Sequence, residues 1–167
     1  LPNRMLYRDR LSHAIALSQR NGRRLAVLYV DLDLFKKIND SLGHATGDRL
    51  LQLAAERIVT CVRGSDTVSR QGGDEFALLL PEAPDAQDAA ATAEKILHAF
   101  AEPYTVDDHE IFITASIGIA MYPVDGSDAE ALMQSADFAM YHAKESGRNR
   151  CQFFTPDMNV RAVEWRS

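Results

Sequence analysis

Residues 25–33, LAVLYVDLD, limit most strongly what this chain can fold into. The segment is almost wholly apolar until Asp31, and it lacks the alternation of a strand with one wet face. Such a run is typical of a central strand that is buried on both faces. It therefore predicts a sheet covered by helices on each side. Asp31 and Asp33 end the run two residues apart, so we expect both side chains on one face.

The remaining periodicities predict a mixed order of helices and strands. Helices are expected at residues 5–20, 46–62, 88–100 and 128–146, with a short helical turn or loop at 34–41. Strands are expected at 66–71, 75–80, 110–121 and 151–154, in addition to 25–33. Hairpins and helices are mixed rather than strictly alternating. The fold class predicted is α/β, with a central, mostly antiparallel sheet flanked by helices.

Composition narrows the class of protein. The 167 residues suffice for one well-packed domain, and no apolar run approaches the roughly 18 residues that span a bilayer. A net charge of −6 gives no general attraction to nucleic acid, so no nucleic-acid partner is expected. Cys61 and Cys151 fit reduced thiols, and no signal peptide is recognised. We therefore expect a cytoplasmic protein, whose parent could be anchored in a membrane through other segments.

Four acidic residues border the predicted core. Asp31 and Asp33 end one strand, and Asp74 and Glu75 open another. Carboxylates at neighbouring strand ends suit Mg²⁺, which takes one or two of them together with water and phosphate oxygens. Strand alternation predicts that only one of Asp74 and Glu75 faces Asp31. The alternative is that all four are solvated strand ends or turn residues.

Residues 35–48, FKKINDSLGHATGD, combine features of an anion and base site. Backbone N–H groups that enter a helical turn after a strand can hold an anion, and Lys36 adds positive charge. Asn39 and Asp48 can read a guanine edge through paired donors and acceptors, with His44 nearby. Alternatively, Asp48 caps the next helix and His44 is an ordinary surface residue.

Two further pairs have a structural and a functional interpretation. Gly72 and Gly73 predict a hairpin turn, or else clearance for a nucleotide to approach the backbone. Lys144 and Arg148 are four residues apart, so both can face one anion if the helix continues through Gly147. Otherwise they belong to a solvated basic face.

Three motifs in order resemble those of the GGDEF family of diguanylate cyclases. These are GGDEF at residues 72–76, DLDLFKKINDSLGHATGD at 31–48 and ADFAMYHAKESGRNR at 136–150. The resemblance implies a fold like the palm of nucleotidyl cyclases and polymerases, over residues 1–154. It also implies the condensation of two GTP molecules to cyclic di-GMP, with release of two pyrophosphates.

The resemblance further implies roles for individual residues. Asp31 and Asp74 would bind Mg²⁺ (or Mn²⁺) through their side chains, and Leu32 through its carbonyl. Asp74 or Glu75 would assist deprotonation of the ribose 3′-hydroxyl. The residues expected to contact GTP are Phe35, Lys36, Asn39, His44, Asp48, Gly72, Gly73, Lys144 and Arg148, with the three cations at the phosphates and Lys36 also counted as catalytic.

Regulation and partners are implied in the same way. Each domain would hold one GTP, so catalysis needs a homodimer of facing domains. Arg63 and Asp66, in RGSD, match an inhibitory motif that binds cyclic di-GMP. The second arginine that often completes that site is absent, because Glu94 and Lys95 occupy its expected place.

The end of the chain suggests a larger protein. Residues 155–167, TPDMNVRAVEWRS, read as a linker to a missing EAL phosphodiesterase domain, with a new helical start around an exposed Trp165. The resemblance therefore leaves an alternative to a working cyclase. The domain would then sense GTP or cyclic di-GMP and regulate the attached phosphodiesterase.

Overall fold

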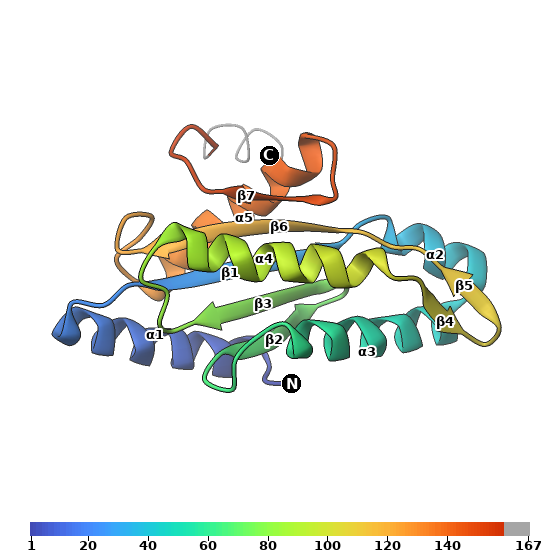
Figure 1. The fold of residues 1–167 in the computed structure, drawn as a ribbon, viewed down its shortest axis with the longest axis horizontal. Helices are drawn as coiled ribbons and strands as arrows, with labels where there is room; N and C mark the ends of the chain where they lie inside the picture. Colours follow the sequence, from blue (N-terminus) through green and yellow to red (C-terminus); the bar gives the residue numbers. More distant parts are fainter. Residues whose placement is uncertain (159–167) are drawn as a thin grey trace.

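The computed structural model describes residues 1–158 and consists of a central sheet with helices on both faces (Figure 1). The helices are α1 (Arg4–Asn21), α2 (Phe35–Leu42), α3 (His44–Thr60), α4 (Ala86–Ala101) and α5 (Ala129–Glu145). The strands are β1 (Leu25–Leu32), β2 (Thr67–Gly72), β3 (Glu75–Leu80), β4 (Tyr104–Val106), β5 (His109–Ile111), β6 (Ala115–Tyr122) and β7 (Arg150–Phe153).

The main sheet has the strand order β2-β3-β1-β6-β7. Strand β1 pairs antiparallel with both β3 and β6, β2 pairs antiparallel with β3, and β7 alone runs parallel to its neighbour β6. The predicted fold class, an α/β fold around a mostly antiparallel sheet, is therefore confirmed. The central place of β1 also agrees with the apolar run from which it was predicted.

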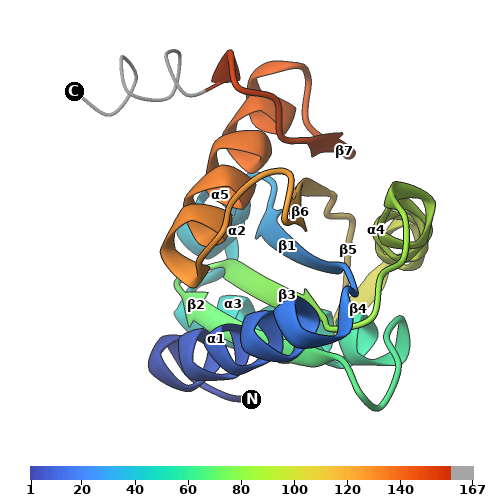
Figure 2. The ribbon, with the colours of Figure 1, turned by 90° about the vertical axis from the view of Figure 1, so that its left-hand side faces the viewer.

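Alternate residues of β1 enter two separate hydrophobic cores. Leu28 and Val30 face a core built with α3 and α4, whereas Val27 and Tyr29 face a core built with α1 and α5. Helices α4 and α5 accordingly lie on opposite sides of the sheet (Figure 2). All eight residues of β1 are buried. This double burial explains why the segment carries apolar side chains at successive positions.

Helix α5 lies unusually close to β6 at Gly118. A Cβ at this position would overlap the backbone carbonyl of Ala136 and the amide of Met140, and would lie 2.8 Å from the carbonyl carbon of Ala139. Only glycine permits this approach, because every other residue carries the Cβ. The contact fixes α5 against the sheet and so places its last turn near the end of β1.

The predicted strand 110–121 was wrong in its first part. Residues 109–111 form β5, which pairs with β4 in a separate two-stranded hairpin, and β6 begins only at Ala115. Asp107 and Asp108 make the turn, both with positive φ. Arg57 of α3 holds the base of this hairpin, since its guanidinium donates to the carbonyls of Ala99, Glu102 and Pro103. These long-range contacts had no local sequence signal.

The other expected elements were found with shifted ends. Residues 34–41, predicted as a helical turn or loop, form most of α2, and the next helix begins at His44 rather than at residue 46. The expected linker at 155–167, including Trp165, lies mostly outside the described residues. Within residues 1–158, no helix has the length and apolar character needed to cross a bilayer.

Substitution Gly118→Ala is expected to lower the free energy of unfolding by about 1–3 kcal/mol, because the added methyl group meets helix backbone that cannot rotate away. Urea unfolding measures the difference. Gly64→Ala is the matched control, since a Cβ there meets no atom within 4 Å. Equal stability of the two variants would contradict the close packing of α5 on β6.

Candidate active site

A buried carboxylate, Asp31, lies at the end of β1. Asp31 as a whole is only 4% exposed, and Lys144 of α5 donates a hydrogen bond to its Oδ2. Its Oδ1 is buried and has no hydrogen-bond partner among the described residues. Burial, and secondarily the neighbouring Asp74, raise the pKa of Asp31 from 3.8 to about 7, although Lys144 acts in the opposite direction. An unpartnered buried carboxylate oxygen is costly in stability unless a ligand satisfies it.

Asp33 has a different environment, although it is equally buried. Its carboxylate accepts hydrogen bonds from the hydroxyls of Thr114 and Ser116, both at 2.6 Å, and from the backbone N–H of Asn149 at 3.1 Å. Ser116 is also the cross-strand partner of Asp31, so the two acids share a face of the sheet as predicted. The alternative that they are solvated strand ends is wrong. Asp33 joins β1, β6 and the segment after α5, while Asp31 retains an oxygen for a ligand.

The hairpin between β2 and β3 brings both of its acids to Asp31. Asp74 lies in the turn, where its carbonyl accepts the N–H of Leu32 at 3.2 Å and its side chain interacts with Asp31. Glu75 begins β3 directly opposite Asp31 in the register. The prediction that only one of these acids faces Asp31 was therefore wrong, because Asp74 does not continue the strand.

Gly72 and Gly73 have the backbone conformation of a turn, with φ values of 145° and 52°. A Cβ at either position would meet no atom within 4 Å. Backbone conformation rather than packing therefore requires glycine here. The guanidinium of Arg70 donates two hydrogen bonds to the carbonyl of Gly73, at 3.0 and 2.8 Å, and so holds the turn.

Asp31, Asp33, Asp74 and Glu75 are together called the acidic cluster below. Helices α2 and α3 follow β1 and form the α2–α3 corner. Leu34, with φ 59°, turns the chain from β1 into α2, where Phe35 is buried in the core and Lys36 is exposed. Asn39 is half-buried and its Oδ1 has no hydrogen-bond partner in the described part of the chain. Helix α2 therefore carries a cation, Lys36, at its start and an amide, Asn39, one turn later.

His44 and Asp48 are both exposed, and they are one turn apart at the start of α3. The alternative role of Asp48 as a helix cap is wrong, because α3 begins at His44 with Gly43 at the capping position. The polar residues predicted in this segment thus lie along α2 and on the first turns of α3.

The predicted pairing of Lys144 with Arg148 on one helix is wrong. Helix α5 ends at Glu145, and Gly147 and Arg148 both have positive φ. The chain reverses there because the N–H of Arg148 donates to the carbonyl of Ala143 at 3.0 Å. Lys144 reaches the acidic cluster and Arg148 is exposed on the turn after the helix, so their spacing of four residues does not fix a common direction.

Arg63 and Asp66 meet in a tight turn outside this region. The N–H of Arg63 donates to the Asp66 carboxylate at 2.8 Å, and the N–H of Asp66 donates to the Arg63 carbonyl at 3.0 Å. A cavity of about 70 Å³ adjoins them, and its lining includes Lys95 of α4. Glu94 instead lies near Cys151, whose thiol is 3.7 Å from its carboxylate. The structure thus offers Lys95 as the cation nearest to the expected place of the second arginine.

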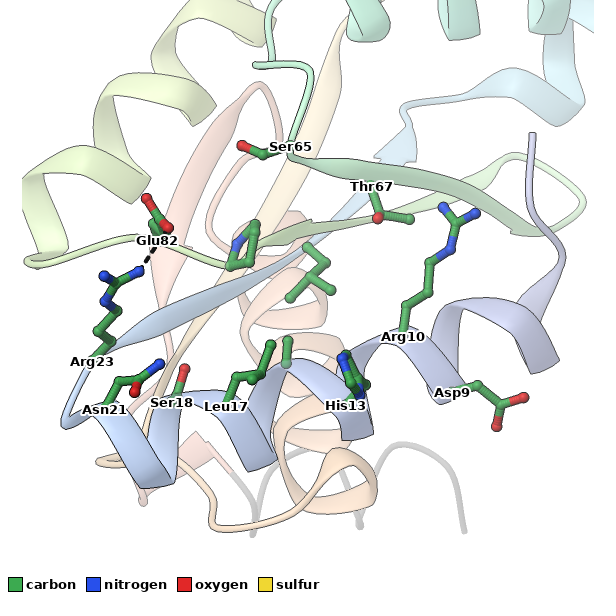
Figure 3. A pocket seen from close by; sticks show the side chains of 13 residues that line it. Asp9, Arg10, His13, Leu17, Ser18, Asn21, Arg23, Ser65, Thr67 and Glu82 are labelled. Carbon is green, nitrogen blue, oxygen red and sulfur yellow. Dashed lines mark hydrogen bonds and ion pairs between the residues drawn. The ribbon is translucent and has the colours of Figure 1, made fainter.

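A larger cavity, of about 420 Å³, lies between α1 and the edge of the sheet formed by β2 and β3 (Figure 3). Leu17 and Leu79 are among its apolar lining residues. An ion pair of 2.8 Å between Arg23 and Glu82 lies at one end (Figure 3). None of the predicted site residues lines it. The size of a cavity therefore does not locate the candidate site in this fold; the buried acids do.

The raised pKa of Asp31 predicts a pH dependence of stability. Since its folded-state pKa lies above the unfolded value of 3.8, the native state retains a proton that the unfolded state has lost, and stability falls as the pH rises from about 4 to about 7. Asp31→Asn, a neutral mimic, should avoid this loss. Its stability relative to the original chain should therefore increase between pH 4 and pH 8, as measured by urea unfolding in metal-free buffer. Asp9→Asn, at an exposed position, is the control. If the difference in unfolding free energy between Asp31→Asn and the original chain were the same at every pH, the raised pKa of Asp31 would be contradicted.

Similarity to known proteins agrees with this arrangement. The chain is 54% identical over 98% of its length to the bifunctional diguanylate cyclase/cyclic di-GMP phosphodiesterase MucR of Pseudomonas aeruginosa, and 38% identical over 98% to the cyclic di-GMP phosphodiesterase NbdA of the same organism. It spans only 24% and 21% of the length of these two relatives. The crystal structure of the GGDEF domain of TpbB (YfiN) from Pseudomonas aeruginosa superimposes with a TM-score of 0.92 and 41% identity, over 93% of this chain and 97% of that one.

The family model "Diguanylate cyclase, GGDEF domain" matches residues 1–150, which include every residue of the acidic cluster and of the α2–α3 corner. The match extends over the whole central sheet as far as the start of β7. The chain belongs to the GGDEF domain family of diguanylate cyclases.

Proposed function

We propose that this domain condenses two GTP molecules to cyclic di-GMP, with Mg²⁺ and as a pair of facing domains. The observation that carries the proposal is the buried Asp31, which has one unpartnered oxygen beside Asp74 at the end of the central strand. Membership of the GGDEF family supports the same reaction. Binding of GTP and cyclic di-GMP signalling follow from this proposal.

The residues present fit a divalent cation. Asp31 and Asp74 would hold it through their carboxylates and Leu32 through its carbonyl, and all three supply the oxygen ligands that Mg²⁺ prefers. A cation would satisfy Asp31 Oδ1 and would offset the repulsion between the two acids, which raises the pKa of Asp31. When bound, Mg²⁺ or Mn²⁺ would neutralise charge on the polyphosphate during phosphoryl transfer.

GTP would lie between the acidic cluster and the α2–α3 corner. Lys36, Lys144 and Arg148 would bind the phosphates, although Lys144 must first leave Asp31. The guanine would be read by Asn39 and Asp48, with His44 at its edge. Phe35 would support the corner from the core, and the open backbone of Gly72 and Gly73 would leave room for the nucleotide.

The reaction needs an oxygen nucleophile from each substrate. The 3′-hydroxyl of one GTP would lose its proton to Asp74 or Glu75 and attack the α-phosphorus of the other GTP, breaking the bond to the β-phosphate and releasing pyrophosphate. A second, equivalent step would close the ring. Because each domain provides one GTP, the two domains would face each other in an isologous arrangement and a monomer would be inactive.

A second function is favoured by the relatives. NbdA is a phosphodiesterase and MucR is bifunctional, and this chain corresponds to less than a quarter of each. Residues 1–154 would then be a GTP or cyclic di-GMP sensor, and residues 155–167 a linker to an EAL phosphodiesterase domain. Under either function, Arg63 and Asp66 would bind cyclic di-GMP, with Lys95 supplying the further cation.

Asp74→Asn is expected to reduce cyclic di-GMP formation at least 100-fold, because it removes both a metal ligand and a proton acceptor. Product is measured by chromatography after incubation with GTP and Mg²⁺, with the domain fused to a dimerising coiled coil. The rate of cyclic di-GMP formation by Glu75→Gln, compared with that of Asp74→Asn, shows which of the two acids takes the proton from the 3′-hydroxyl. Asp9→Asn is the control at an exposed position on α1.

The cyclase proposal fails if the dimerised domain makes no cyclic di-GMP. Saturable GTP binding without turnover would then support the sensor. Full turnover by Asp74→Asn would refute the assignment of this residue to the metal and the proton.

Lys144→Met should have opposite effects on the metal and the nucleotide. The substitution removes the hydrogen bond by which Lys144 competes with a metal for the Asp31 carboxylate. In the absence of nucleotide, Mn²⁺ should therefore bind about tenfold more tightly, which corresponds to the loss of one charge-assisted hydrogen bond. The affinity for GTP should fall, since a phosphate-binding cation is gone. Electron paramagnetic resonance of Mn²⁺ and calorimetry with GTP measure the two affinities. Unchanged Mn²⁺ affinity would show that Lys144 does not compete with the metal.

A further inference from the structure

Gly47 stands where a helix would ordinarily disfavour glycine. It is buried in α3, in the segment that carries His44 and Asp48, and its φ is not in the left-handed region. Glycine in a helix costs about 1 kcal/mol relative to alanine. Since the backbone conformation does not require glycine, the space beside it must.

That space is filled by the side chain of Asn39. A Cβ on Gly47 would overlap Asn39 Oδ1, lie 2.8 Å from Asn39 Cγ, and lie 3.3 Å from Cζ of the buried Phe35. The amide of Asn39 therefore rests directly on the Cα of Gly47. No residue with a Cβ leaves Asn39 in this position.

The α2–α3 corner holds the two residues at this distance. Gly43, with φ 92°, joins the helices; its N–H donates to the carbonyl of Asn39 at 2.9 Å, and its carbonyl accepts the N–H of Gly47 at 3.1 Å. Backbone hydrogen bonds thus connect Asn39 to Gly47 through one residue. The backbones of Asn39 and Gly47 are therefore held close together by the geometry of the corner.

This contact determines which way the amide faces. Asn39 Oδ1 is buried against Gly47 with no hydrogen-bond partner in the described structure, while Asn39 as a whole is only half-buried. The Nδ2 group consequently lies on the open side. A buried amide oxygen without a partner costs roughly 1–3 kcal/mol, so stability alone does not account for the arrangement.

We infer that Gly47 is a positioning residue for base recognition: it fixes the Asn39 amide with Nδ2 outward, as a hydrogen-bond donor beside the carboxylate acceptor of Asp48. This inference rests on the proposed binding of GTP. A positioned donor from Asn39, together with an acceptor from Asp48, the residue after Gly47, matches a 2-amino-6-oxopurine, whose ring N–H and amino groups donate and whose oxygen and ring nitrogens accept. Adenine has an unprotonated ring nitrogen where guanine has its ring N–H. The lone pair of that nitrogen would face the Asp48 carboxylate, and no hydrogen bond could form between them.

The test is Gly47→Ala, with nucleotide affinities measured by calorimetry in Mg²⁺ without cyclic di-GMP. The methyl group should displace the Asn39 amide, so that GTP binds at least tenfold more weakly and the preference for GTP over ATP falls by a similar factor. The helix itself should tolerate alanine, which is the better helix former. The thermal midpoint is therefore expected to stay within a few degrees of the original chain, and Gly64→Ala, at an open position, should change neither affinity.

A double-mutant cycle separates positioning from general damage. In an Asn39→Ala background the two atoms closest to the new methyl group are gone, and only Phe35 Cζ, at 3.3 Å, remains near it, so Gly47→Ala should have much smaller further effects on GTP affinity and on stability. The side-chain amide resonances of Asn39 should also shift in Gly47→Ala, a change that a purely structural role for Gly47 elsewhere would not produce. If Gly47→Ala alone fails to fold, recovery of folding in the double variant would support the contact.

Three outcomes would overturn the inference. Wild-type GTP affinity and selectivity in Gly47→Ala would show that the amide is not positioned by Gly47. Equal losses in the presence and absence of Asn39 would assign the effect to packing alone. Failure of the original chain to bind GTP would reject the proposed function together with this inference, and is recognised before any variant is made.

Discussion

The double burial of β1 is the constraint on which the rest of the structure depends. Its residues face two cores, so the strand is held by β3 and β6 in the sheet and by helices on both faces. Asp31 lies at the end of this rigid strand. Carboxylates placed on such a support keep their geometry without a ligand, which is the preorganisation that a metal site needs.

The site is built at a cost in stability. Asp31 is buried with one unpartnered oxygen, and burial raises its pKa to about 7. Asn39 likewise buries an amide oxygen without a partner. Asp33 shows that the same strand end can satisfy a carboxylate fully, with three hydrogen bonds. The proposed binding of a cation and a nucleotide would account for these unsatisfied groups.

Most of the fold could be predicted because its signals are local. The apolar run of β1, the glycine pair of the hairpin and the helical periodicities each concern neighbouring residues. The predictions of secondary structure were wrong where residues far apart in the sequence determine the conformation. The β4–β5 hairpin depends on Arg57, from a helix far earlier in the chain, and α5 ends before Arg148 because Ala143 accepts its N–H.

The sequence by itself determined the family, the central strand and the residue types of the site, since motif spacing and polarity are properties of the chain alone. Only the tertiary structure decided how those residues meet. It placed Lys144 on Asp31, brought Asp74 and Glu75 together beside the same carboxylate, and set the Asn39 amide on Gly47. Such contacts depend on packing distances between separate elements, and spacing along a chain does not encode a distance across a core.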